Sequence, residues 1–445
     1  MFIKYLRIKS YKKLKDFEIS FSGNGDFRKE FKEFYGDMNF TVLVGENGVG
    51  KTTVMSFIAN IFYNLERYHS RIPSDFELQY NIFNNHTGKY HEVKLCKKKE
   101  NIFIQPNTDE QEYLLLERIY RGKGIWHSRR KKDQLEIVNE DIKFNDIIGI
   151  LPSEVITSAF SIHGEYPSNR NGNYKGRKIL KNYNVDVIYG KNHFGGLSIS
   201  AGISKFIQQY IAQKELIENL LQKFNLEFGN AVRIYNVSVS GEEGLFEEEY
   251  WINLSELDAK KIEELFELEQ NNKIYFNDLI FFKSDALITL NEMSSGEKMF
   301  FYRIFSIMSS ISDNSLVIIE EPELHLNPSW IKQIISMFYS LFKDYKSHFI
   351  IATHSYSFIN TLFPDNILIF KNNEAKNPSF NTFLAGEKEI IYNMFEHSNV
   401  ENYPEFEVMK KIKLANKKEL KEMMNFLGES LYRFIVYNEI ENSED

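Results

Sequence analysis

Residues 45–53 carry the strongest chemical pattern in the sequence, Gly-Glu-Asn-Gly-Val-Gly-Lys-Thr-Thr. This run matches the phosphate-binding loop (P-loop) G-x-x-x-x-G-K-[ST] and stands between a predicted strand, 39–44, and a predicted helix, 54–65. Glycines let successive backbone N–H groups face a phosphate, and a helix N-terminus adds a partial positive charge. The alternative is a glycine-rich turn without a ligand. We predict phosphate contacts from Asn47, Gly48, Gly50, Lys51, Thr52 and Thr53, with Thr52 also binding Mg²⁺.

Two adjacent acids, Glu320 and Glu321, follow a short apolar run. Residues 316–319 are too few for a helix and too continuously apolar for a half-exposed strand, so we predict a buried parallel strand. Ligands of open parallel sheets bind beyond the carboxyl ends of the strands. The two acids could therefore hold a cation or act as a base, and the alternative is an acidic surface turn.

Two further patterns in the sequence are candidates for contacts with a bound anion. A second apolar run, 349–353, ends directly before His354 and again places a polar group at the end of a buried strand. A histidine there is often only structural, but beside a P-loop and two acids it is a candidate sensor of the terminal phosphate. Residues 294–297, Ser-Ser-Gly-Glu, open a predicted helix and form a second helix N-terminus that can bind an anion.

The order of these motifs resembles the head of an ABC-class ATPase, with a P-loop, a signature at residues 294–297, an acid-terminated strand and a switch histidine, His354. The runs 321–328, Glu-Pro-Glu-Leu-His-Leu-Asn-Pro, and 351–355, Ile-Ala-Thr-His-Ser, resemble the branch of RecF, SMC and OLD-type ATPases. Within that branch the sequence most resembles the AAA-labelled ATPases of bacterial anti-phage systems, such as the Septu and retron-associated PtuA proteins.

The resemblance covers about residues 1–66 and 285–370. It implies an α/β fold: a P-loop ABC ATPase head with an N-terminal antiparallel β lobe and an inserted β-rich and helical lobe. The insertion lacks sustained heptads, which excludes the long coiled coil of SMC proteins. The predicted regions are an ATPase N-terminal lobe (1–67), an inserted β-rich and helical region (68–277), an ATPase C-terminal lobe (278–385) and a helical tail (386–445).

In ABC heads two protomers enclose two ATP molecules, and the signature of one protomer faces the nucleotide held by the other. The resemblance therefore implies ATP and Mg²⁺ as cofactors and a homodimer or higher homo-oligomer. It implies catalytic roles for Lys51, Glu321 and His354, with Glu321 orienting or deprotonating the attacking water. Thr52 and Glu320 would hold the metal. The nucleotide bound by the other protomer would be contacted by Ser294, Ser295, Gly296 and Glu297.

Two departures from the family pattern bear on the rate of hydrolysis. The magnesium position usually carries Asp, and Glu320 is one methylene longer. The signature reads Ser-Ser-Gly-Glu-Lys instead of Leu-Ser-Gly-Gly-Gln. Both departures could slow hydrolysis and leave ATP acting largely as a structural ligand. The glutamine loop of the family has no clear match, and residues 158–163 are the candidate replacement.

Four segments outside the motifs carry specific structural expectations. Residues 204–228 predict one long amphipathic helix, and residues 255–268 predict a second helix with a Ser-x-x-Asp cap that begins at Ser255. Residues 169–181 are polar and basic and contain glycine, which predicts a mobile surface loop. Residues 330–342 predict a helix beyond the acidic strand.

The composition is that of a globular protein of 445 residues with a net charge of −8 and one cysteine. No apolar run is long enough for a membrane span, and the N-terminus lacks a signal-peptide core, so we predict a cytoplasmic protein. The net charge excludes a global nucleic-acid footprint. A local basic cluster, Arg118–Lys132, surrounds Tyr120 and Trp126 and could contact DNA. The alternative is a solvated hairpin tip.

Three functions follow from these patterns. The first is an ATP-hydrolysing dimer that regulates a separate effector, a nuclease, in anti-phage defence. The second is a RecF-like DNA repair or recombination ATPase that acts directly on DNA. The third is a structural module that binds ATP with little turnover. The tail, 386–445, lacks the length and the Asp-x-Asp pattern of a fused Toprim nuclease, so any DNA cleavage should come from a separate subunit.

Overall fold

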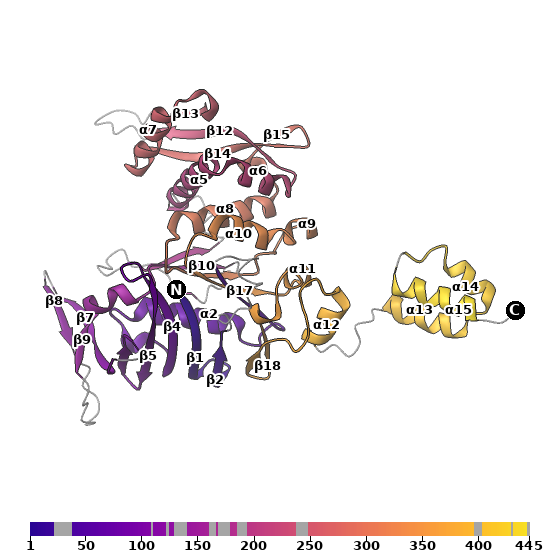
Figure 1. The fold of residues 1–445 in the computed structure, drawn as a ribbon, viewed down its shortest axis with the longest axis horizontal. Coiled ribbons are helices and arrows are strands. Elements are labelled where there is room, and N and C mark those ends of the chain that lie inside the picture. Colours follow the sequence, from indigo (N-terminus) through magenta and orange to yellow (C-terminus); the bar gives the residue numbers. More distant parts are fainter. Residues whose placement is uncertain are drawn as a thin grey trace. The chain divides into compact units, whose positions relative to one another are not determined.

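The structure is a computed structural model, and it describes two compact units, Met1–Ala385 and Gly386–Asp445 (Figure 1). Among the described residues, no helix is both long enough and apolar enough to cross a membrane. The described residues are 1–21, 38–107, 110–121, 124–128, 140–159, 166–167, 179–184, 194–236, 248–395, 403–428 and 430–442.

The sheet that carries the predicted motifs is mostly parallel. Its strands are β3 (Asn39–Val44), β10 (Val155–Ala159), β11 (Leu180–Asn184), β16 (Leu316–Glu320), β17 (His348–Thr353), β18 (Ile367–Lys371) and β19 (Glu374–Lys376). Their order is β11-β10-β16-β17-β3-β18-β19, with β18 and β19 antiparallel. Strand β17 pairs in parallel with β16 on one side and with β3 on the other. The carboxyl ends of these three strands therefore meet at one edge of the sheet.

A second sheet is antiparallel and contains the N-terminus. Its strands are β1 (Phe2–Tyr11), β2 (Leu14–Ser20), β4 (Phe76–Asn84), β5 (Lys89–Lys98), β6 (Asn101–Gln105), β7 (Tyr113–Arg121), β8 (Gly124–Ser128) and β9 (Asp141–Lys143). Their order is β2-β1-β4-β5-β6-β7-β8, and β9 pairs in parallel with β7. The predicted α/β fold with an N-terminal antiparallel lobe is confirmed.

Helix α2 (Lys51–Asn64) belongs to the core shared by these two sheets. Its apolar residues lie on all sides of the helix and are buried, which is typical of a helix covered on every face. Phe57 packs against Tyr11 of β1 and Phe76 of β4, while Phe62 packs against Tyr80 of β4. The burial of α2 fixes the position of the P-loop that precedes it.

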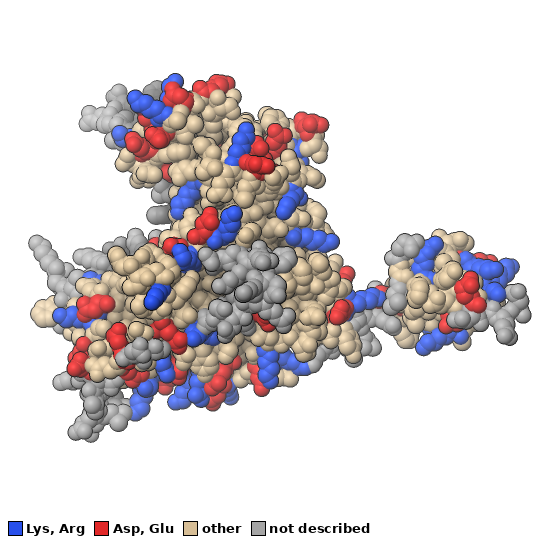
Figure 2. Space-filling view, in the orientation of Figure 1, with Lys and Arg blue, Asp and Glu red and all other residues tan. Residues whose placement is uncertain are grey.

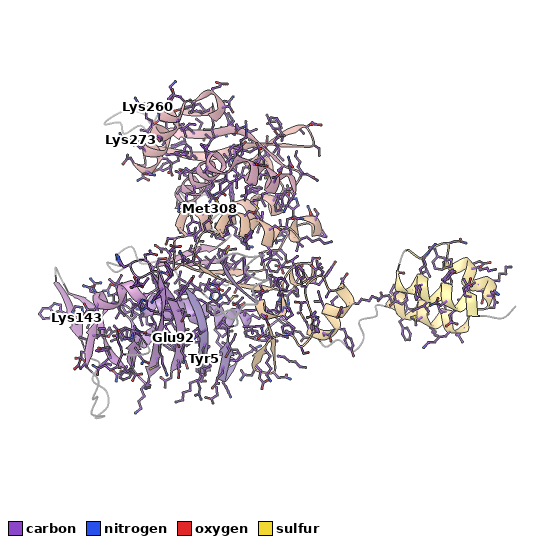
Figure 3. All side chains as sticks on the ribbon, viewed as in Figure 1. Tyr5, Glu92, Lys143, Lys260, Lys273 and Met308 are labelled. Carbon is purple, nitrogen blue, oxygen red and sulfur yellow. The ribbon has the colours of Figure 1, made fainter. Side chains whose placement is uncertain are left out.

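A third sheet, antiparallel, has the order β13-β12-β14-β15. Its strands are β12 (Glu227–Asn236), β13 (Glu248–Asn253), β14 (Ile274–Lys283) and β15 (Ala286–Thr289). The helices near it are α5 (Phe194–Ala212), α6 (Lys214–Gln222), α7 (Ala259–Gln270) and α8 (Ser295–Ser310). Figure 1 shows α5 between this sheet and α8. Met308, which Figure 3 labels, is a buried residue of α8.

The predicted helix over 204–228 is wrong in its extent. The structure has α5 and α6 with a break at Gln213, and the chain is already in strand β12 at Phe228. Tertiary packing explains the difference, because Phe228 contacts Phe206 of α5 and Phe281 of β14. These contacts place Phe228 in the sheet, although the apolar periodicity of the sequence would also fit a helix at this position.

Three smaller expectations also need correction. Helix α7 begins at Ala259 with Asp258 as its cap, whereas Ser255 lies in a preceding 3₁₀ turn. The predicted helix over 330–342 is split into α9 (Pro328–Ile331) and α10 (Ile334–Phe342). Residues 180 and 181 of the predicted loop are in β11, and the loop's residues 169–178 lie outside the described residues.

The predicted inserted region, 68–277, contributes strands to all three sheets. It supplies β4 to β9 of the antiparallel sheet, β10 and β11 of the parallel sheet, and β12, β13 and the start of β14 in the third. The boundaries at 67 and 277 stay a prediction. The described part of the larger unit also contains two short helices, α3 (Phe144–Ile147) and α11 (Tyr356–Ile359).

The second unit consists of helices. It contains α12 (Glu387–Phe395), α13 (Tyr403–Leu414), α14 (Lys417–Met423) and α15 (Leu431–Asn442). A buried cluster within it comprises Ile412, Leu420, Met423 and Val436. Lys388 of α12 donates to Glu405 of α13 and to the hydroxyl of Tyr432 of α15. The unit therefore has apolar and polar contacts of its own.

Candidate functional site

A cavity of about 320 Å³ lies at the edge where β3, β16 and β17 end. It brings together the P-loop, the two acids and the predicted switch histidine, which are far apart in the sequence. The signature residues 294–297 are not among the residues that line it. The lining residues are Lys12, Lys13, Asn47, Gly48, Gly50, Lys51, Thr52, Thr53, Glu320, Glu321, Ala352 and His354.

The P-loop owes its shape to glycine. Gly48 and Gly50 have φ angles of +79° and +114°, a left-handed region that other residues adopt only at a cost. Gly50 also occupies the N-cap position of α2, and no side chain caps the helix there. The N-terminus of α2 therefore lies at the cavity without a side-chain cap from its N-cap residue, which leaves its N–H groups suited to an anion.

Lys51 is buried, and its ammonium is held by the loop that it follows. Its Nζ donates to the carbonyl oxygens of Gly45, at 2.7 Å, and Glu46, at 2.9 Å. Burial lowers the pKa of Lys51 to about 8, while the nearby carboxylates, Glu321 foremost, oppose that shift. An anion entering the cavity would favour the charged form of this lysine.

Two lysines of the turn between β1 and β2, Lys12 and Lys13, also reach the cavity, and the sequence reasoning did not assign them. Lys13 Nζ donates to the Gly48 carbonyl at 3.3 Å. Lys12 lies over the ring of Tyr11, with its Nζ 5.5 Å from the ring centroid. Two consecutive lysines at a predicted hairpin turn can be recognised in the sequence as a candidate anion-binding feature. Their proximity to the P-loop, however, depends on tertiary structure.

Glu320 is the last residue of β16 and is buried. The hydroxyl of Tyr166 donates to its Oε1 at 2.9 Å, and Arg303 Nη2 donates to its carbonyl oxygen at 3.3 Å. Arg303 Nε also donates to Ser158 Oγ at 2.9 Å. Burial lowers the pKa of Arg303 to about 9, and the carboxylates of Glu323, Glu320 and Glu321 oppose this shift.

Neither Tyr166 nor Arg303 was identified from the sequence. Arg303 could have been noticed, because a cation in an otherwise apolar helix needs a buried partner. Tyr166 carried no local signal. Ser158, the first residue of the predicted glutamine-loop replacement, lies in β10 beside Arg303, and residues 160–163 of that segment lie outside the described residues.

Glu321 and His354 lie side by side in the lining of the cavity. Glu321 Oε1 lies 3.7 Å from His354 Nε2, and both side chains keep about a third of their surface exposed, 39% and 31%. Burial and the charge of Lys51 lower the pKa of His354, so its imidazole is neutral at pH 7. Glu321 has a φ of +40°, a strained backbone that costs about 1–3 kcal/mol and is concentrated at functional sites.

The signature residues lie at the start of α8, outside the cavity. Ser294 is the N-cap, and its N–H and hydroxyl both donate to Glu297 Oε2, at 3.0 and 2.7 Å. Glu297 Oε1 accepts from Lys283 at 2.5 Å. The carboxylate of Glu297 is thus engaged within its own chain. A Cβ at Gly296 would lie 2.1 Å from the carbonyl oxygen of His325, so this position requires glycine.

The predicted basic cluster is described only in part. Arg118 Nη1 donates to Glu66 Oε1 at 2.9 Å, and its side chain is mostly buried. Trp126 is 62% exposed, whereas Lys123 and residues 129–132 lie outside the described residues. On the face shown in Figure 2, basic and acidic side chains are interspersed. The DNA contact predicted for this cluster stays a prediction.

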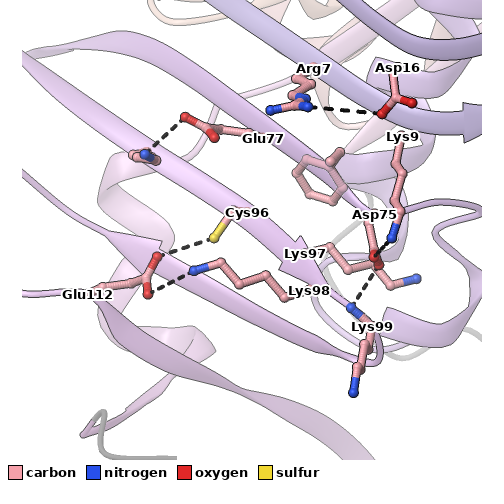
Figure 4. Close-up of a pocket in the computed structure, with 12 residues that line it drawn as sticks. Arg7, Lys9, Asp16, Asp75, Glu77, Cys96, Lys97, Lys98, Lys99 and Glu112 are labelled. Atoms are coloured by element: carbon pink, nitrogen blue, oxygen red, sulfur yellow. Dashed lines mark hydrogen bonds and ion pairs between the residues drawn. The ribbon is translucent and has the colours of Figure 1, made fainter.

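A second cavity, of about 460 Å³, lies on the antiparallel sheet (Figure 4). Four ion pairs link its lining residues: Arg7 with Asp16, Lys9 with Asp75, Lys94 with Glu77, and Lys98 with Glu112. Lys97 and Lys99 also line it, so the lining residues carry more positive than negative charge. Burial raises the pKa of the Cys96 thiol to about 12, so this sulfur is not a reactive thiolate at neutral pH. No residue of the P-loop lines this second cavity, and neither do the paired acids or His354.

The sequence is similar to those of known proteins. A family model described as "AAA domain, putative AbiEii toxin, Type IV TA system" matches residues 40–360. The chain is 30% identical to the Retron Ec83 probable ATPase of Escherichia coli over 130 residues, which are 27% of this chain and about a quarter, 24%, of that protein. It is 21% identical to the Retron Vc95 probable ATPase of Vibrio cholerae serotype O1 biovar El Tor over 394 residues, 77% of this chain and 71% of that protein.

Two solved structures with partial similarity are heads of SMC proteins. An SmcHead bound to the C-winged helix domain of ScpA gives a TM-score of 0.40 at 14% identity and covers 88% of this chain and 99% of that chain. The SMC head domain from Thermotoga maritima gives a TM-score of 0.37 at 12% identity and covers 84% of this chain and 97% of that chain.

Proposed function

Because the chain belongs to the family of AAA domains described as putative AbiEii toxins of Type IV toxin–antitoxin systems, we propose that it binds and hydrolyses ATP. One observation carries the proposal. The P-loop, the paired acids and His354 line one cavity, although they come from separate stretches of the chain. The names of the two relatives, both retron probable ATPases, support the same activity.

The phosphates of ATP would bind at the N-terminus of α2. The backbone N–H groups of the P-loop and the ammonium of Lys51 would contact them, and Lys12 and Lys13 would add positive charge at the cavity wall. Mg²⁺ prefers oxygen ligands, and Thr52 and Glu320, which carry a hydroxyl and a carboxylate, both line this cavity and would hold the ion. Tyr166 fixes one carboxylate oxygen of Glu320 by its hydrogen bond. When bound, Mg²⁺ would offset the charge of the phosphates.

The hydrolytic step would use Glu321 and His354. Glu321 is accessible and would orient or deprotonate a water, and phosphoryl transfer depends mainly on such positioning and on charge stabilisation. His354 is neutral and lies beside it, so its imidazole would donate a hydrogen bond to the terminal phosphate. Glu297 would position Ser294 at the signature instead of contacting a nucleotide itself, because its carboxylate is already engaged.

A Glu321→Gln substitution tests the activity. We expect the variant to bind Mg²⁺-ATP within about twofold of wild type but to release phosphate at least about 100-fold more slowly, because general-base catalysis contributes on that scale. A fluorescent ATP analogue measures binding, and a phosphate-release assay measures turnover. Glu374→Ala, on β19 away from the cavity, is the control and should behave like wild type.

The same measurements separate hydrolysis from the alternative of a structural ATP-binding module. If wild type and the Glu321→Gln variant retain nucleotide equally and neither releases phosphate, the hydrolytic assignment is wrong and the structural module remains.

We further propose that the ATPase regulates a separate effector, a nuclease, in anti-phage defence. The retron relatives support this context. The RecF-like alternative requires direct DNA binding through the Arg118–Lys132 cluster. Within this cluster, Arg118 already donates a hydrogen bond to Glu66. DNA affinity measured at several salt concentrations distinguishes the two, because phosphate contacts give a steep salt dependence. Affinity without that dependence, or none at all, contradicts the DNA-acting alternative.

A further inference from the structure

Glu323 lies two residues beyond Glu321 and does not line the cavity. Its Oε1 accepts two hydrogen bonds from the end of β17, one from the hydroxyl of Thr353 at 2.5 Å and one from the backbone N–H of His354 at 3.0 Å. The oxygen of Thr353 accepts in turn from the N–H of Ser355, at 3.0 Å. One carboxylate therefore fixes the backbone on which the predicted switch histidine is carried.

The turn that contains Glu323 is held in place from both sides. The carbonyl oxygen of Glu321 accepts from Leu324 N, at 3.1 Å, and that of Glu323 accepts from Leu326 N, at 3.0 Å. The N–H of Glu321 donates to Ala352, at 2.8 Å. On the other side, the carbonyl of His325 packs against Gly296 at the start of α8. Glu323 thus presents its carboxylate from a fixed support.

The charge of Glu323 also acts on the cavity. It opposes the lowering of the pKa values of His354 and Lys51 that burial causes. Its second oxygen, Oε2, is buried without a hydrogen-bond partner among the described residues. The carboxylate therefore combines a directional role, through Oε1, with an electrostatic one.

We propose that Glu323 is a positioning residue that holds His354 in the orientation needed at the terminal phosphate. This inference rests on the proposed ATPase function. A purely structural role would instead satisfy two partly buried donors and support the fold, with no particular dependence on the imidazole. The two roles differ in whether the effect of Glu323 passes through His354.

A double-mutant cycle with Glu323→Ala and His354→Ala measures that dependence. We expect Glu323→Ala to slow phosphate release about tenfold while the KM for ATP changes less than about twofold, because misplacing a catalytic group affects turnover more than binding. In the His354→Ala background the same substitution should have no further effect. Glu323→Gln keeps an acceptor at the same position and should restore most of the rate. Glu374→Ala is the matched control.

The outcomes distinguish this inference from the proposed function. If wild type hydrolyses ATP but the two alanine substitutions slow it independently, so that their effects multiply, Glu323 does not act through His354. If wild type releases no phosphate, the ATPase proposal is wrong. The NMR signal of the His354 imidazole can then still show whether Glu323 acts on His354.

That imidazole can be followed by NMR, with its signal assigned by its loss in His354→Ala. Glu323→Ala removes both hydrogen bonds, so it should shift the imidazole resonances of His354 at a pH where the ring is neutral, whereas Glu323→Gln keeps an acceptor and should leave them close to the wild-type positions. Imidazole resonances that stay unchanged in Glu323→Ala would overturn the inference whether or not the protein hydrolyses ATP.

Discussion

Lys51 combines burial with a positive charge. Two carbonyl oxygens accept from its ammonium, yet burial lowers its pKa to about 8. Three acids, Glu320, Glu321 and Glu323, oppose that shift and keep the ammonium protonated at neutral pH. The lysine is therefore charged when nucleotide binds, but only within a limited range of pH.

ATP affinity should accordingly depend on pH. A bound phosphate raises the pKa of Lys51, so affinity is full below the free-state value of about 8 and falls as the pH rises through it. The loss should approach about tenfold for each pH unit above that value. Titrations of a fluorescent ATP analogue between pH 7 and 9.5 measure the effect. Lys51→Ala should bind more weakly at pH 7 and show no such decline; the same decline in that variant would assign the titration to another group.

Helix α8 connects several parts of the molecule. Its N-terminus is the predicted signature, Arg303 on its buried face contacts β10 and β16, and its later turns pack against α5. The contact with α5 is close, because a Cβ at Gly202 would lie 2.1 Å from the carbonyl oxygen of Phe305. The third sheet and its helices are therefore packed closely on the helix that carries the signature.

A Gly202→Ala substitution tests this packing. In an exposed helix the change would stabilise the protein by about 0.5–1 kcal/mol. Here we expect a loss of about 1–3 kcal/mol in the free energy of unfolding, because the methyl group forces α5 away from α8. Urea unfolding measures the difference. Gly149→Ala, where no atom lies within 4 Å of the added Cβ, should change stability little. A stabilised Gly202→Ala variant would contradict the close contact.

At the scale of the whole molecule, the cavity and the signature are separate surfaces of the larger unit. Ser294 to Glu297 open α8 without lining the cavity that holds Lys51. We propose that a second copy supplies its signature to this cavity, so that two copies enclose two ATP molecules. A glycine-bearing helix N-terminus suits a terminal phosphate because both its N–H groups and its dipole favour an anion.

ATP should therefore drive association. We expect the Glu321→Gln protein to double its mass in light scattering when Mg²⁺-ATP is added, because slow turnover keeps the closed state populated. Ser295→Arg should prevent this association while leaving ATP binding intact. The longer arginine side chain would occupy the space of the nucleotide held by the other copy. A Glu321→Gln protein that stays monomeric with and without ATP is incompatible with the two-copy arrangement.

The sequence by itself determined the parts whose chemistry is local. The P-loop is recognisable because strand, glycine turn and helix follow one another directly, and the backbone geometry of Gly48 and Gly50 needs no distant contact to be anticipated. The acid-terminated strand was equally visible, because a fully buried parallel strand requires a continuous apolar run.

Tertiary structure alone decided which distant side chains join these motifs. Tyr166 reaches Glu320 across 154 residues of chain, and Arg303 reaches Ser158 across 145. The same holds for Phe228, which packing placed in a strand although the periodicity predicted a helix. A local pattern records whether a side chain is buried or exposed, but not which partner meets it. At the cavity, that choice depends on the spatial order of the strands, in which β17 lies between β16 and β3.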